Sequence, residues 1–135
     1  MLVSAPPTPT RRTFGLLPLA WVAFIMVSTL TPSADMPPLP HWQLLSFDTA
    51  AHAFVFGVLA VLGTFSARRQ QRWPWLHRHA FGAVFGFSVA LGALVEILQM
   101  RMALGRHGEW SDLLSDALGV AAGTLLIWAT RHRWQ

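Results

Sequence analysis

The polar residues best suited to chemistry lie at the ends of three long apolar segments of this sequence. A carboxyl or imidazole group inside a membrane-spanning helix costs free energy, so each one needs a partner or a functional role. Up-and-down threading of the segments places all of these ends on the same side of a membrane. The residues are Asp48 and His52 at the start of one segment, Glu96 and Gln99 at the end of the next, and Asp112 and Asp116 at the start of the last.

Spacing within two of the segments aligns these residues on single helix faces. Asp48 and His52 are four residues apart, and Glu96 and Gln99 are three apart, so each pair shares a face. Asp48 also suits the capping of its helix. An ionised Glu96 in hydrocarbon is costly, so it is expected to be protonated, paired or bound to a metal. A structural ion pair of Glu96 with His52 or a nearby arginine is the simpler alternative.

The last apolar segment carries its acidic and small residues on one stripe. Asp112, Asp116, Gly119 and Gly123 follow a spacing of four, three and four, which keeps them on one helix face. The two glycines let a neighbouring helix approach closely. Arg106, in the connection just before, is the natural counter-charge for the acids. We therefore expect three helices to deliver acids, an imidazole and an amide to one outer polar pocket.

The apolar residues occur in long uncharged runs, which is typical of a membrane protein. The chain has 135 residues, of which 53% are hydrophobic and 12% charged, with a mean hydropathy of +0.43. A helix needs about 20 residues to cross the hydrocarbon layer. The predicted fold is therefore all-α, a four-helix transmembrane bundle forming one domain over residues 13–135. The predicted spans are residues 14–30, 47–66, 80–100 and 110–130, and Gly82 and Gly86 repeat the close-packing spacing in the third.

The basic residues indicate the orientation in the membrane. All ten are arginines, and eight of them precede the first span, follow the last or lie between the second and third. Arginines flank the cytoplasmic ends of spans, so both termini and the middle connection are predicted to be cytoplasmic. Residues 1–12 then form a disordered cytoplasmic leader. The chain is predicted to be a multi-pass protein of the inner (cytoplasmic) membrane.

Charge and cysteine content exclude other classes of partner and site. The sequence pI of about 11.6 does not come from a basic soluble face, so the lipid bilayer is the expected partner and nucleic acid is not. The absence of cysteine rules out disulfides and thiolate sites. Any metal here would need histidine or carboxylate ligands.

Taken in order, these motifs resemble the VanZ-like family of small integral membrane proteins, named for a member associated with teicoplanin resistance. The family's aspartate and histidine four residues apart are matched by Asp48 and His52 in FDTAAH. Its glutamate and glutamine pair is matched by Glu96 and Gln99 in EILQ. The family's final signature is an arginine, an aspartate, an asparagine and glycines, and it corresponds to Arg106, Asp112, Asp116, Gly119 and Gly123.

Two positions depart from the family pattern. Thr49 stands where a lysine usually follows the first aspartate, and Asp116 stands where an asparagine is usual. The second change adds a carboxyl group next to Asp112, which strengthens cation binding or is neutralised by protonation.

The leading functional hypothesis is a membrane protein of the cell envelope that binds a lipid headgroup or a cell-wall-related ligand in the outer pocket. Arg106 would take an anionic group, and the remaining polar residues would hydrogen-bond to it or orient it. The resemblance implies an influence on glycopeptide (teicoplanin) susceptibility. The expected ligand-binding residues are Asp48, His52, Glu96, Gln99, Arg106, Asp112 and Asp116.

The main alternative is a metal-dependent intramembrane hydrolase or transferase acting on an envelope lipid. In it, His52, Glu96, Asp112 and Asp116 would hold a divalent metal that activates water. No H-E-x-x-H motif supports this hypothesis. A small proton-coupled transporter and a purely structural assembly protein are further alternatives. The sequence leaves open whether the protein is an enzyme and which cofactor or metal it requires.

Overall fold

Long apolar helices dominate the structure, a computed structural model that describes residues 15–35, 47–102 and 110–133. These ranges contain helices and no strands. Three helices are long and apolar enough to cross a membrane, namely α2 (Phe47–Arg69), α4 (Ala80–Met102) and α5 (Trp110–Ala129). The predicted starts of all three helices are confirmed, and each of their ends lies within three residues of the predicted end. The protein is therefore all-α and has the helices of a multi-pass membrane protein.

The first predicted span is shorter than the other three. Helix α1 (Leu16–Leu30) is apolar but has only 15 residues. At 1.5 Å per residue it is about 22 Å long, which falls short of a hydrocarbon layer of about 30 Å. Four spanning helices therefore stay a prediction, whereas three membrane-capable helices and one shorter apolar helix are observed.

Short helices that the sequence pattern did not predict occupy the connections. They are η1 (Ser33–Asp35), α3 (Pro74–Arg78) and η2 (Arg131–Arg133). Gln70 closes the turn before α3, because its side-chain amide donates to the Trp73 carbonyl at 2.9 Å and its amide oxygen accepts from the Trp73 N–H at 2.8 Å. Pro74 then starts α3, at a position where its missing N–H is not needed.

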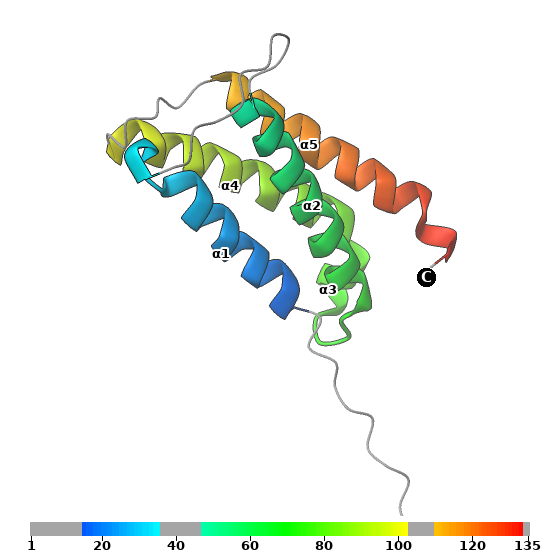
Figure 1. Cartoon of the computed structure of the whole chain (residues 1–135). Coiled ribbons are helices and arrows are strands. Elements are labelled where there is room, and N and C mark those ends of the chain that lie inside the picture. The colour runs from blue at the N-terminus through cyan, green and yellow to red at the C-terminus, as the bar shows by residue number, and fades with distance from the viewer. Residues whose placement is uncertain (1–14, 36–46, 103–109, 134–135) are drawn as a thin grey trace, which may run out of the picture.

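Helices α2 and α5 lie side by side, α4 packs against both, and α1 lies beside α2 and α4 (Figure 1). The core between them is formed by Ile25, Phe56, Val95 and Val120, one from each of the four long helices, and all four are fully buried. Trp21 ties α1 to α2, since its indole N–H donates to the Val55 carbonyl at 2.8 Å. The polar ends of α2, α4 and α5 are thereby held at the same end of the molecule.

Glycines set the distance between α2 and α5. A Cβ atom at Gly119 would overlap the backbone carbonyl of Ala53, and one at Gly123 would overlap the carbonyl of Gly57. The close packing predicted for these two glycines is confirmed. The same prediction was wrong for Gly82 and Gly86 on α4, because no atom of residues 15–35, 47–102 or 110–133 lies within 4 Å of a Cβ built at either position.

The surface of the long helices is apolar. Phe54, Leu118 and Leu126 are each more than half exposed, as are Trp73 and Trp110 close to helix ends. At the carboxyl end of α5, the Arg131 guanidinium lies 4.0 Å from the centre of the Trp128 ring. Apolar faces that end in tryptophans and arginines suit a lipid bilayer and its two interfaces.

The contact at Gly119 leads to a matched prediction. Gly119→Ala adds a methyl group against the α2 backbone and should lower the free energy of unfolding by about 1–3 kcal/mol. Gly82→Ala adds the same group into open space and should be neutral or slightly stabilising, because alanine favours a helix. Unfolding in mixed detergent micelles measures both. Equal effects would show that close approach at Gly119 is not required.

The predicted orientation is testable by single-cysteine labelling, since the natural chain contains no cysteine. Ala34→Cys, in exposed η1, should react with a membrane-impermeant maleimide added to intact cells. Gln71→Cys, exposed between α2 and α3, should react only after the membrane is permeabilised. The reverse pattern would place the termini outside. Labelling of both cysteines from outside would show that α2, which lies between them, does not cross the membrane.

Candidate functional site

The polar residues singled out from the sequence come together where the first turns of α2 and α5 meet the last turns of α4. His52 is the sixth residue of α2, so it lies about 7 Å along the helix from its start. We use the name polar cluster for the four acids and one imidazole at this end. The polar cluster consists of Asp48, His52, Glu96, Asp112 and Asp116.

His52 connects α2 to both neighbouring helices. Its Nδ1 lies 3.0 Å from Asp116 Oδ1 on α5 and 3.8 Å from Glu96 Oε1 on α4. All three side chains are almost completely buried, with exposed fractions of 2% for His52, 5% for Glu96 and 0% for Asp116. The sequence alternative in which Glu96 pairs with His52 is therefore consistent with the observed geometry.

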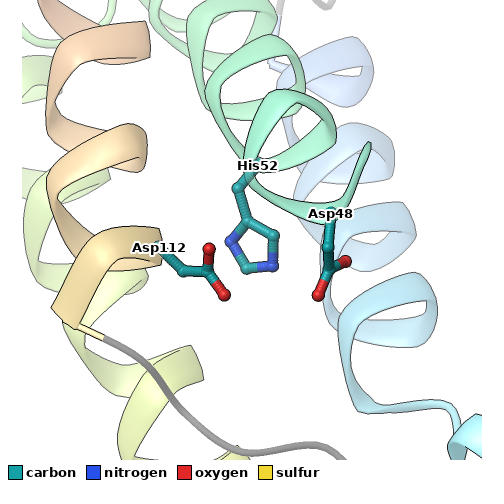
Figure 2. Close-up of side chains that lie close together, drawn as sticks. All are labelled: Asp48, His52 and Asp112. Atoms are coloured by element: carbon teal, nitrogen blue, oxygen red, sulfur yellow. The ribbon is translucent and has the colours of Figure 1, made fainter. Parts of the chain in front are cut away.

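A second group of acids faces the same imidazole. Figure 2 shows the His52 ring between the carboxyl groups of Asp48 and Asp112. One ligand atom from each of these residues lies within 4.8 Å of the others. His52 thus belongs to two groups of three, one with Asp48 and Asp112 and the other with Glu96 and Asp116.

Hydroxyl groups that sequence reasoning did not assign to the site hold α2 against α5. Thr49 Oγ1 donates to Asp112 Oδ1 at 3.0 Å, and Ser115 Oγ donates to the Thr49 carbonyl at 2.6 Å. Thr49 was noted only as a departure from the family pattern. Its position next to Asp48 gave no signal of this contact, because consecutive residues of a helix point in different directions.

A glycine on α4 makes room for the Asp116 carboxyl group. A Cβ built at Gly92 would lie 2.8 Å from Asp116 Oδ2, which is closer than packed atoms approach. Gly92 lies four residues before Glu96 and is buried on the same face of α4. Sequence reasoning missed this residue, since a single glycine in an apolar helix gives no signal of what it faces.

The two remaining residues predicted for the site, Gln99 and Arg106, are not part of the polar cluster as the structure describes it. Gln99 is 2% exposed and its side-chain amide donates to the Thr29 carbonyl of α1 at 2.9 Å. This bond fixes α1 against α4 beside the polar cluster, so Gln99 has a demonstrated contact outside the cluster. Arg106 lies outside the described residues.

Electrostatics explain why carboxyl groups are placed at these helix ends. Asp48 and Asp112 are in the first turns of α2 and α5, where the unpaired backbone N–H groups carry partial positive charge and stabilise acids. Asp116 lies one turn deeper and relies on its contact with His52. Buried carboxyl groups around one imidazole form a site for hydrogen-bond donors and cations.

One comparison with known proteins gives a match. The family model described as VanZ/LLP1 matches residues 3–131, and the chain belongs to this family. No curated protein and no solved structure matches the chain. The resemblance seen in the sequence motifs is thereby confirmed at the level of the family.

The bond between His52 and Asp116 leads to a prediction for stability. Removing one partner leaves the other buried without its bond, so His52→Ala and Asp116→Ala should each destabilise the protein. A double-mutant cycle should give a coupling energy of about 1–3 kcal/mol. The control cycle pairs His52→Ala with Asp35→Ala, in exposed η1, and should give less than about 0.5 kcal/mol. Equal coupling in both cycles would contradict a specific bond.

Proposed function

We propose that this VanZ/LLP1 family protein binds the polar head of an envelope lipid or a cell-wall-related ligand at the polar cluster. The single observation that carries the proposal is the convergence of buried acids and an imidazole from α2, α4 and α5 at one end of the molecule. Polar side chains inside a membrane protein are expensive and are retained for function. A bundle held together only by packing would not need them.

The proposal includes the arrangement in the membrane. The three long helices and the shorter α1 all cross the cytoplasmic membrane, both termini are cytoplasmic, and the polar cluster opens to the outside. The distribution of arginines in the sequence supports this orientation. Arg106, which the sequence assigns to the outer connection before α5, would contact an anionic group of the ligand.

An apolar groove beside the cluster supports a lipid as the ligand. The groove has a volume of about 620 Å³ and runs along α2 and α5 on their exposed side. Ala53 directly follows His52, and Gly119 lies three residues after Asp116, so the groove starts next to the polar cluster. An acyl chain in the groove would place a headgroup at the cluster. The groove is lined by Ala53, Gly57, Val61, Leu118, Gly119 and Leu126, among others.

The same binding would connect the protein to glycopeptide susceptibility. A protein that captures a lipid-linked or cell-wall-related ligand at the outer surface changes how much of that ligand is available to an antibiotic. We propose this as the route to the teicoplanin phenotype for which the family is named.

Native mass spectrometry of protein extracted gently from its membrane tests the function. The wild type should retain a lipid or cell-wall precursor. Glu96→Gln should reduce retention about tenfold or more, because a hydrogen bond to a charged group is worth about 1.5–3 kcal/mol, and Arg106→Ala should do the same. Asp35→Asn, an exposed acid in η1, is the matched control and should retain the ligand.

Two results would contradict the proposal. The first is a wild-type protein that carries no ligand above the level of bulk membrane lipid. The second is retention that is unchanged in both Glu96→Gln and Arg106→Ala while the proteins remain folded by gel filtration.

A further inference from the structure

The two nitrogens of His52 have different surroundings. Nδ1 lies 3.0 Å from Asp116 Oδ1 and is hydrogen-bonded to it. An ionised carboxylate only accepts hydrogen bonds, so in that state Nδ1 carries the proton. A neutral imidazole has one protonated nitrogen, and therefore Nε2 carries the lone pair. The contact with Asp116 thus selects the tautomer in which Nε2 is free to bind an electrophile.

Nε2 has no use in the packing of the helices. The His52 side chain is 2% exposed, and Nε2 has no hydrogen-bond partner within the described part of the chain. A buried lone pair without a partner costs about 1–3 kcal/mol. If the side chain at position 52 served packing alone, we would expect Nε2 to have a hydrogen-bond partner, or an apolar ring such as phenylalanine to stand in its place.

Two acids complete a set of ligands around this imidazole. Asp48 and Asp112 lie on either side of the ring (Figure 2), and ligand atoms of the three residues lie within 4.8 Å of one another. The two acids come from different helices, Asp48 from the first turn of α2 and Asp112 from the first turn of α5. The other group of three, with Glu96 and Asp116, already uses Nδ1 in a hydrogen bond.

We infer that His52 Nε2, Asp48 and Asp112 bind a divalent transition-metal ion such as Zn²⁺ or Mn²⁺. One imidazole nitrogen with carboxylate oxygens suits these ions better than Mg²⁺ or Ca²⁺, which prefer oxygen alone. Asp116 takes the role of the carboxylate that orients a metal-binding histidine through its other nitrogen. Thr49, which donates to Asp112 Oδ1 at 3.0 Å, orients that acid in the same way.

Three protein ligands leave coordination positions for an external group. This resolves a difficulty of charge, because the polar cluster brings together carboxyl groups from Asp48, Glu96, Asp112 and Asp116 and would repel an anionic headgroup. A bound divalent cation attracts such a headgroup and coordinates its phosphate or carboxylate oxygen. This bridging role rests on the proposed function, whereas the metal site itself does not.

Metal binding is measured on the full chain, purified in detergent with a tag that contains no histidine. The protein is stripped with a chelator, and Zn²⁺ or Mn²⁺ is titrated by calorimetry, with the metal content measured after gel filtration. The wild type should bind one ion per chain. His77→Gln, in exposed α3, is the matched control for adventitious binding to surface histidines and should bind like the wild type.

The metal affinities of cluster variants show which of the two groups of three residues binds the ion. His52→Gln should weaken binding more than 100-fold, and Asp48→Asn and Asp112→Asn should each weaken it at least about tenfold. Asp116→Asn should weaken it about 10- to 100-fold, as is usual for residues that orient a metal ligand. Glu96→Gln should weaken binding less than His52→Gln and less than either aspartate variant, because Glu96 acts on the ion only through its charge and is not a ligand in this set.

Several outcomes would overturn the inference. They are no stoichiometric uptake by the wild type, uptake that survives His52→Gln, and uptake that is lost in Glu96→Gln but unchanged in Asp48→Asn. If His52→Gln fails to fold by gel filtration and circular dichroism, the two aspartate variants decide the question.

Native mass spectrometry of the stripped and loaded wild type separates the metal site from the proposed ligand binding. A retained lipid without metal binding overturns only the metal site, and a bound metal without a retained lipid overturns only the proposed function.

Discussion

Close contact between α2 and α5 is the constraint on which the rest of the structure depends. The backbone carbonyls of Ala53 and Gly57 occupy the space where a side chain at Gly119 or Gly123 would lie. Apolar side chains gain little by leaving lipid for protein, so helices in a membrane associate through close packing and polar contacts. The glycines permit both, because the distance that they set brings His52 and Asp116 within 3.0 Å.

The polar cluster illustrates how buried polar groups become compatible with an apolar fold. Part of its cost is offset locally, by the helix N-termini at Asp48 and Asp112, by the Thr49 hydroxyl and by the contact between His52 and Asp116. Gly92 on α4 leaves the space that the Asp116 carboxyl group needs. Within the described part of the chain, His52 Nε2 is a buried atom of the cluster that has no hydrogen-bond partner and therefore keeps its binding capacity.

Much of the fold was predictable, because long apolar runs bounded by arginines and prolines have few other structures available. The starts of α2, α4 and α5 agree with prediction to the residue, since each follows a clear change in composition. The short helices in the connections were missed, because they are stabilised by single contacts such as those of Gln70 with Trp73. The span over α1 was predicted too long at its start, where Gly15 precedes the helix.

The structure brings together five of the seven residues predicted for the site, and the sequence did not predict how they pair. Helical spacing and alternate threading were enough to place Asp48, His52, Glu96 and Asp116 at one end. Contacts between helices were not predictable, because helix rotation depends on packing that a single sequence does not reveal. Gly119 and Gly82 occur in the same spacing pattern, yet only Gly119 contacts another backbone.

The sequence by itself determined the class of protein, the approximate extents of the apolar helices and the end of the molecule where the polar residues lie, because hydrophobicity and helical period are local properties. The tertiary structure decided which nitrogen of His52 bonds to Asp116, that Thr49 supports Asp112, and that Gln99 holds α1. These are contacts between residues 63 to 70 positions apart in the chain. They depend on the rotation and separation of packed helices, which arise only when all of the helices pack together.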